Sequence, residues 1–390
     1  MLKLNRAFAG LTVLMLGAMV VPAASLDSYV QTNLTSDLPG VAAHQDPNLV
    51  NPWGIVASPT SPFWISDNHS GLSTLYNGTG AALPLVVTIP PPVGGSGPAA
   101  PTGIVFNSTA GFSGAHFIFD TEDGTLASWS AGTSAILQAT SAPGSVYKGL
   151  AIGGSGSASM LFAANFGLGR VDVFDSNFKP TTVAGSFKDN TIPAGYAPFN
   201  IQNINGNLYV TYALQDAAKH DDVRGPGHGF IDVFDTGGNL VRRLTSQGAL
   251  NSPWGLALAP AGFGAFGGDL LVGNFGDGRI NVYDPGSAAF LGMLDGAGGA
   301  PIAVEGLWGL SFGNGVFGQN PRTLYFTAGI PGSGKVEDHG LFGSLASTAT
   351  PEPSSATLLG AAGMGALLFS MAKRLVKNKL TGDSSTRSAE

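Results

Sequence analysis

The chain has no cysteine among its 390 residues, so it can form neither a disulfide framework nor a thiolate metal site. Charge is also scarce, because Asp, Glu, Lys and Arg together make up only 11% of the residues. The sequence contains no Gly-x-Ser-x-Gly elbow, no Walker loop and no His-Glu-x-x-His motif. It therefore carries no local signature of a serine hydrolase, a P-loop NTPase or a zincin. Glycine is abundant instead, at 58 residues, which indicates many turns.

A short pattern recurs at intervals of 46 to 55 residues and predicts a repeat architecture. It is clearest as Pro-Trp-Gly at 52–54 and again at 253–255, each time followed by an apolar segment of strand length. Six four-stranded blades of a β-propeller fit this period. The equivalent anchor residues are Gly54, Gly103, Gly149, Asn200, Gly255 and Gly309.

Within each repeat, a second apolar strand ends in a turn and a third strand alternates apolar and polar residues. Fourth strands are expected at 85–89, 135–140, 182–187, 240–244 and 290–294. The last repeat supplies only three strands, whereas the alternating segment 29–34 precedes the first blade. We therefore predict an all-β, six-bladed propeller over residues 25–346 whose ring is closed by the N-terminal strand 29–34, which removes an open sheet edge.

Residues 25–346 contain 11 Lys and Arg against 22 Asp and Glu. Nucleic-acid binding depends on clustered basic residues that neutralise phosphates. The acidic balance of the propeller region, a net charge of −11, therefore argues against nucleic acid as a partner.

The two ends of the chain resemble targeting segments. Residues 1–24 combine Lys3 and Arg6 with an apolar run and the small residues Ala23 and Ala24, which predicts a secretory signal peptide; a retained membrane anchor is the alternative. At the other end, a linker at 347–355 leads to a transmembrane helix predicted at 356–375 and a basic, polar cytoplasmic tail at 376–390.

The linker contains Pro351, Glu352 and Pro353 ahead of the short glycine-rich span and its basic cluster. This order closely resembles the PEP-CTERM sorting signal of Gram-negative bacteria that make exopolysaccharide. The resemblance implies recognition by an exosortase, an inner-membrane-anchored intermediate, and a final location at the cell surface or outside the cell. The chain departs from the pattern by continuing to Glu390, and an ordinary C-terminal anchor is the alternative.

The propeller region resembles a family of exported bacterial proteins with Asn-Pro-Trp-Gly repeats, here at 51–54, and a Lys-His-Asp-Asp loop, here at 219–222. At one remove it is similar to the NHL group of six-bladed propellers. These resemblances imply the fold and export, and no established activity.

The fourth repeat carries a thirteen-residue insertion that is unusually rich in charge for this chain. Binding groups often lie on loops of a rigid scaffold, and His and Asp can serve as metal ligands or general bases. The alternative is a solvated, structurally locked loop in which these residues cap turns or form ion pairs. The candidate binding residues are Lys219, His220, Asp221, Asp222, Arg224 and His228.

No cofactor is expected, although Ca²⁺ or another divalent cation is a possibility. Six-bladed lactonase-like enzymes bind one such ion at the channel mouth through oxygen ligands from separate blades. That resemblance implies, as metal candidates, Asp67, Asn165, Asn200, Asn274 and Glu305. The segment 120–124, Asp-Thr-Glu-Asp-Gly, lacks the spacing of a calcium loop and is interpreted as a turn.

Trp53, Trp254 and Trp308 occupy equivalent repeat positions and are expected to pack between blades, with carbohydrate stacking as the alternative. The leading hypothesis for function is an exported surface or matrix protein that binds an exopolysaccharide or a surface protein. A metal-dependent hydrolase of the lactonase type and a structural spacer are the alternatives.

Overall fold

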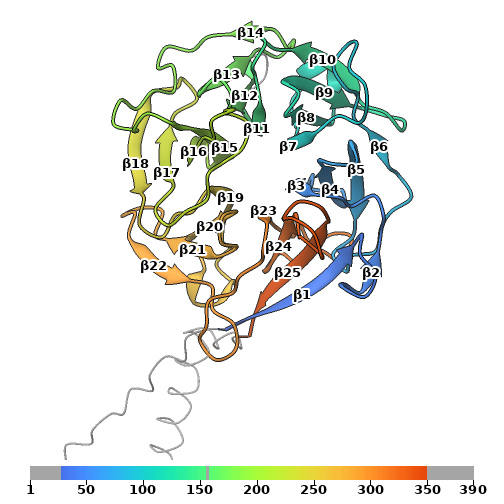
Figure 1. Ribbon diagram of the computed structural model, residues 1–390, viewed down its shortest axis with the longest axis vertical. Coiled ribbons are helices and arrows are strands. Elements are labelled where there is room, and N and C mark those ends of the chain that lie inside the picture. The colour runs from blue at the N-terminus through green and yellow to red at the C-terminus, as the bar shows by residue number, and fades with distance from the viewer. Residues whose placement is uncertain (1–27, 155–157, 349–390) are drawn as a thin grey trace, which may run out of the picture.

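The computed structural model describes residues 28–154 and 158–348, which form an all-β propeller of six blades around a central axis (Figure 1). The predicted signal peptide, linker, sorting motif and transmembrane helix lie outside the described residues. No helix within these two ranges is long and apolar enough to cross a membrane.

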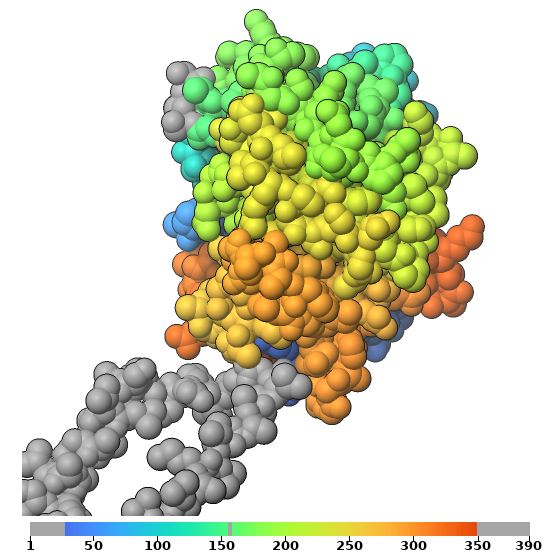
Figure 2. Space-filling view, turned by 90° about the vertical axis from the view of Figure 1, so that its left-hand side faces the viewer, coloured from blue at the N-terminus to red at the C-terminus, as the bar shows by residue number. Residues whose placement is uncertain are grey.

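Each of the first five blades is one antiparallel sheet whose strands follow each other in sequence from the axis outwards. Seen from the rim, neighbouring blades pack side against side (Figure 2). The strands of blade one are β3 (Pro52–Val56), β4 (Phe63–Asp67), β5 (Leu72–Tyr76) and β6 (Val87–Thr88); those of blade two are β7 (Pro101–Phe106), β8 (Phe117–Thr121), β9 (Thr125–Trp129) and β10 (Ile136–Thr140). Blade three contains β11 (Tyr147–Gly153), β12 (Met160–Asn165), β13 (Arg170–Phe174) and β14 (Pro180–Thr181). Blade four contains β15 (Tyr196–Ile204), β16 (Asn207–Leu214), β17 (Phe230–Phe234) and β18 (Leu240–Ser246), and blade five contains β19 (Pro253–Leu258), β20 (Leu270–Asn274), β21 (Ile280–Tyr283) and β22 (Phe290–Met293).

Blade six joins the two ends of the described chain, as predicted. Its inner strands are β23 (Leu307–Phe312), β24 (Thr323–Ala328) and β25 (Leu341–Ser347), and β1 (Tyr29–Ser36) pairs antiparallel with β25. A two-residue strand, β2 (His44–Gln45), extends this sheet and was not predicted. Because the last sheet needs β1 for its fourth strand, the ring closes through backbone hydrogen bonds between the first and last strands.

The fourth strand of blade three differs from the prediction. Segment 182–187 was expected there, whereas the strand is β14 at Pro180–Thr181. The backbone N–H groups of Gly185 and Phe187 instead donate to carbonyls of blade four. The reason is packing, because the Phe187 ring is buried between Phe162 of blade three and Phe234 of blade four.

The anchor residues lie where the innermost strands come closest to each other. A Cβ atom added to Gly54 would lie 2.6 Å from the Thr102 carbonyl oxygen, and one added to Gly255 would lie 2.4 Å from the Trp308 carbonyl oxygen. These contacts leave no room for a side chain, which explains the repeated glycine. Asn200 is the exception, because its side-chain amide donates to the Trp254 carbonyl at 2.7 Å and thereby links blade four to blade five.

Candidate functional site

Six equivalent positions, one on the inner strand of each blade and directly before its anchor residue, form a ring around the axis. Four of them are aromatic and two are polar. In blade order they are Trp53, Thr102, Lys148, Phe199, Trp254 and Trp308.

The aromatic members close the channel. Trp308 stacks on Trp53 with ring centroids 3.5 Å apart and on Phe275 at 3.8 Å, and Trp254 packs edge-on against both tryptophans. Trp254 also donates its indole N–H to the carbonyl of Lys148, across the axis, at 2.8 Å. The three tryptophans therefore pack against each other at the centre of the ring, not between individual blades as predicted. Below them, the remaining channel encloses about 210 Å³ and is lined by residues of all six inner strands.

Lys148 is the charged member of the ring, and its side chain is only 2% exposed. Its ammonium contacts the Glu122 carboxylate and lies 3.5 Å from Asp221 Oδ1. It also lies 5.0 Å from the centre of the Trp53 ring, close enough for a cation–π interaction. The candidate site is therefore the place where the aromatic cluster that closes the channel contacts the buried Lys148–Glu122 ion pair.

Amide side chains connect this ion pair to blade one and blade six. Asn68 donates to Glu122 Oε2 at 2.9 Å, and Asn51 donates to Glu337 Oε1 at 3.2 Å. The indole of Trp308 donates to Asn51 Oδ1 at 3.2 Å. Polar groups from separate blades therefore converge on one mouth of the channel.

Burial and charge set the protonation of this cluster. Burial disfavours the ionised form of Glu122, but the adjacent Lys148 outweighs it and lowers the pKa of the carboxyl. Burial likewise opposes the charge on Lys148, yet Glu122 and Asp221 raise the pKa of the ammonium. For Glu337 burial prevails and raises the pKa to about 7, because Lys148 compensates only in part. Lys148 is therefore a fixed cation, and Glu337 titrates near neutral pH.

The insertion of blade four forms a short hairpin between β16 and β17 that lies over the mouth. A bridge between Gln215 and Asp222 continues the sheet, and Asp216 Oδ1 accepts the backbone N–H of His220 at 2.9 Å to form the turn. The hairpin thus holds His220 and Asp221 against the ion pair of blades two and three.

Four of the predicted binding-loop residues lie at the mouth. His220 Nδ1 is 2.8 Å from Asp221 Oδ1, and this contact raises the pKa of His220 and lowers that of Asp221 to about 2. The Arg224 guanidinium covers the Phe275 ring at 4.3 Å, and burial raises the pKa of Asp222.

The other two predicted binding-loop residues have different surroundings. Lys219 is exposed in the turn with a positive φ of 58°, and His228 Nδ1 is bonded to the Val223 carbonyl at the base of the hairpin. The structure therefore places four of the six residues beside the channel mouth.

The predicted metal candidates come from separate blades, and most of them are engaged in hydrogen bonds of the protein. Asp67 is fully buried and accepts a hydrogen bond from Thr74, Asn165 bonds to Ser145 and Asp172, and Asn274 bonds to Ala249 and Asp277. The Asn200 amide links two blades, and Glu305 is exposed. Each of the four buried side chains thus has hydrogen-bonding partners within the blade framework.

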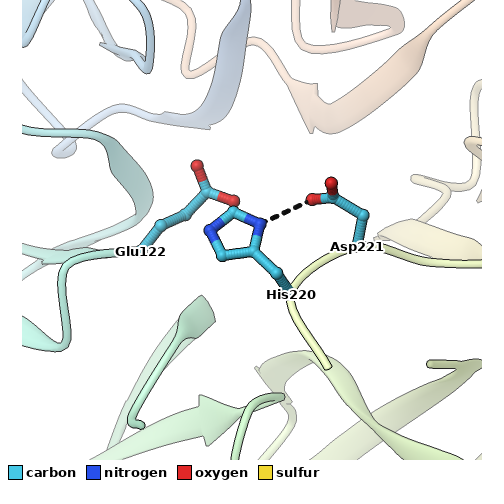
Figure 3. A group of neighbouring side chains, drawn as sticks. All are labelled: Glu122, His220 and Asp221. Carbon is cyan, nitrogen blue, oxygen red and sulfur yellow. Dashed lines mark hydrogen bonds and ion pairs between the residues drawn. The ribbon is translucent and has the colours of Figure 1, made fainter. Parts of the chain in front are cut away.

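A different trio offers metal-type donors at the mouth. One ligand atom each from Glu122, His220 and Asp221 lies within 4.8 Å of the others, with the imidazole between the two carboxylates (Figure 3). The Lys148 ammonium, however, already contacts Glu122 and lies 3.5 Å from Asp221. A divalent cation here would compete with that buried positive charge. The arrangement is therefore better suited to hydrogen-bonding a polar ligand than to holding a metal.

Three residues of the site were not identified from the sequence: Glu122, Lys148 and Glu337. Segment 120–124 is a turn, as predicted, since the Gly124 N–H donates to the Thr121 carbonyl at 3.0 Å. The turn nevertheless directs Glu122 to the channel mouth. A signal for Lys148 was present, because aligning Tyr-Lys-Gly at 147–149 with Pro-Trp-Gly at 52–54 puts a lysine at a tryptophan position.

Comparison with known proteins shows the family. No protein-family model matches the chain. Uncharacterized protein L690 of Acanthamoeba polyphaga mimivirus is 35% identical over 309 residues, which cover 74% of this chain and 80% of that protein. Uncharacterized protein R648 of the same virus is 34% identical over 303 residues, covering 73% and 72% respectively. The chain belongs to this family.

The similarity of this chain to solved structures shows only its fold. A catalytically inactive variant of virginiamycin B lyase from Staphylococcus aureus matches with a TM-score of 0.50 at 15% identity, covering 82% of this chain and 99% of that one. A protein of unknown function from Bacteroides thetaiotaomicron matches with a TM-score of 0.52 at 9% identity, covering 82% and 76%. The family is therefore one of six-bladed propellers that resemble virginiamycin B lyase in fold.

Proposed function

We propose that this propeller is exported and binds a polar polymer, an exopolysaccharide, at the mouth formed by Glu122, Lys148, His220 and Asp221. The observation that supports this most is the Lys148–Glu122 pair, buried at a ring position that is aromatic in four other blades. A buried ion pair is poor at stabilising a fold, because the desolvation of both charges offsets their attraction. Its place at the channel mouth, beside the cluster of aromatic rings, suits recognition of hydroxyl groups.

The groups at the mouth match the chemistry of a sugar. Carboxylates accept hydrogen bonds from hydroxyls, and the second ring nitrogen of His220 can donate one. The buried Lys148 ammonium and the amides of Asn51 and Asn68 hold Glu122 and Glu337 in place behind the exposed groups. Asp221 and His220 are 69% and 49% exposed, so an incoming ligand reaches them before the buried pair. The resemblance of the C-terminal segment to a PEP-CTERM sorting signal supports the polymer as partner, since PEP-CTERM proteins belong to exopolysaccharide-producing bacteria. Exosortase and, through the C-terminal helix, the inner membrane would be partners on the way to the cell surface.

Binding to a glycan array tests this proposal with the full-length protein. We expect Asp221→Asn and His220→Gln to weaken binding at least about tenfold, because each removes a group in contact with the ion pair. Asp277→Asn, a matched acid-to-amide change on the same face in blade five, should leave binding unchanged. Equal binding by all variants would refute the assignment of the mouth.

A metal-dependent hydrolase is the second candidate, favoured by the Glu122–His220–Asp221 trio. It predicts one tightly held divalent ion per chain, lost in His220→Gln, together with hydrolysis of small lactones that requires the ion. Metal analysis of the full-length protein separates the two functions, since glycan binding through Lys148 needs no ion.

A further inference from the structure

A second cavity lies between blades one and two, on the face opposite to the charged mouth. The mouth is built from turns that join second to third strands, such as those of Asn68, Glu122 and Glu337. The cavity is lined by connections from first to second and from third to fourth strands, which in an antiparallel blade lie at the other end. It is an open cavity of about 590 Å³. Because it lies on the opposite face, it is independent of the proposed polysaccharide site.

Aromatic side chains form the wall of this cavity. Trp64 stacks on Phe117 with ring centroids 4.2 Å apart and packs at 4.6 Å against Trp129, which is half-buried at the rim. The rest of the lining consists of Phe106, His116, three leucines, Pro84 and residues of the loop between β3 and β4: Leu75, Leu83, Leu85, Ser58, Thr60, Ser61 and Pro62. The lining contains no Asp, Glu, Lys or Arg, and His116 is its one ionisable residue.

The equivalent space is filled at two other blade junctions of the same molecule. The ten-residue connection of blade two carries Phe112, which is fully buried and packs edge-on against Phe178 of blade three at 5.3 Å. The connection of blade five carries Phe263, also fully buried, which packs against Tyr29 of blade six at 4.8 Å. In both cases a phenylalanine from the connection occupies the gap beside the next blade.

Blade one lacks that residue. Its connection, residues 57–62, is six residues long and reads Ala-Ser-Pro-Thr-Ser-Pro. Within the loop, the Ser58 N–H donates to Ser61 Oγ at 2.9 Å, and from blade six Asn314 donates to the carbonyls of Ser58 and Ser61. The loop is thus fixed in place. Trp64 and Phe117 are buried at the back of the cavity, whereas the rings of Phe106 and Trp129 are partly accessible from it.

We infer that this cavity binds a neutral, planar aromatic molecule of one or two rings, which takes the place that Phe112 and Phe263 fill elsewhere. The volume lies in the range of small-ligand pockets, and stacked or edge-on ring contacts with the half-buried Trp129 and Phe106 would hold the ligand. A sugar suits the cavity less well, because the Ser58 and Ser61 hydroxyls are bonded within the loop and the Trp129 indole N–H donates to the Gly132 carbonyl at 2.9 Å.

Titration of the full-length protein with 2-naphthol, followed by calorimetry, tests the inference. We expect one binding site per chain. Thr60→Phe introduces at the cavity the ring that the loop of blade one lacks, and should weaken binding at least about tenfold. Thr133→Phe, a matched change at an exposed threonine of blade two outside the lining, should have no effect.

Leu83→Trp is a second filling variant and should also reduce binding if Thr60→Phe does not fold. If neither variant folds, NMR of the unmodified protein tests the binding site. The indole N–H resonance of Trp129 should shift on addition of 2-naphthol, whereas those of Trp254 and Trp308 should not. Failure of the unmodified protein to bind 2-naphthol, displacement of 2-naphthol by cello-oligosaccharides, or undiminished binding by a folded filling variant would each overturn the inference. Glycan binding at the opposite mouth is unaffected by any of these outcomes.

Discussion

The ring of six equivalent positions around the channel has an aromatic half and a polar half, which differ in side chains although their backbones are equivalent. Blades four, five, six and one place Phe199, Trp254, Trp308 and Trp53 at the ring position, whereas blades two and three place Thr102 and Lys148 there. The aromatic half packs into a dry cluster that closes the channel. The polar half opens a gap in that cluster, in which Glu122 and Lys148 meet. The comparison teaches that one repeat position can serve stability in some blades and recognition in others.

Trp308→Ala should produce the largest loss, because Trp308 contacts three other aromatic rings of the ring position and Phe275. Truncating a buried tryptophan costs about 3 to 5 kcal/mol of unfolding free energy. Urea denaturation of the full-length protein measures it. Trp129→Ala, at a half-exposed site, is the control and should cost less than half as much. Equal losses would mean that the aromatic half has no special role in stability.

Lys148→Met should lower the free energy of unfolding nearly as much as Trp308→Ala, for a different reason. It leaves the Glu122 carboxylate buried without its cation, which costs about 3 kcal/mol. Adding Glu122→Gln removes the stranded charge, so the double variant should recover most of the loss in urea denaturation. Both variants should lose glycan binding. If the double variant is no more stable than Lys148→Met, the pair is not the source of the effect.

Glu337→Gln should change how stability depends on pH. Burial raises the pKa of Glu337 from the ordinary value of 4.5 to about 7 in the folded protein, so the folded state binds more protons than the unfolded state between these values. The free energy of unfolding therefore falls as pH rises through this window, by about 3 kcal/mol from this group.

Because glutamine cannot ionise, the Glu337→Gln protein should be the more stable one at pH 8, with a smaller difference at pH 5. Unfolding at several pH values measures the gap. Glu305→Gln, at an exposed position, is the matched control and should give the profile of the unmodified protein. A gap that does not grow between pH 5 and pH 8 would contradict the assigned protonation of the mouth.

Asn200→Gly should have the smallest effect. It restores the glycine of the other five anchors but removes the hydrogen bond to the Trp254 carbonyl. We expect a loss of about 1 kcal/mol in urea denaturation. A more stable variant would show that blade four tolerates the glycine anchor as well as its neighbours do.

The fold followed closely from the repeat. The anchor glycines, the apolar second strands and the alternating third strands are local features, and they predicted six sheets and the pairing of segment 29–34 with the last blade. The error at 182–187 arose because Phe187 looks like a strand residue in sequence but is buried across two blades. Local patterning does not distinguish a residue within a sheet from one that packs between sheets.

The site was predicted only in part. The insertion was visible as a dense group of charges, and His220 and Asp221 lie at the mouth. Glu122 and Lys148 were missed because they are 26 positions apart in sequence and lie in different blades, so no spacing rule connects them. The oxygen ligands carried over from lactonase-like enzymes lie instead in separate hydrogen-bonding environments.

The sequence by itself determined the number of blades, the strand order and the closure of the ring, because each depends on glycine turns and period-two alternation that neighbouring residues specify. Only the tertiary structure decided which charges meet. Radial closure brings the second turns of blades one, two, four and six to one mouth. There, Glu122 and Asp221 raise the pKa of Lys148 despite its burial, whereas burial raises the pKa of Glu337 to about 7. Burial of that kind depends on all six blades at once, and no single segment of the chain encodes it.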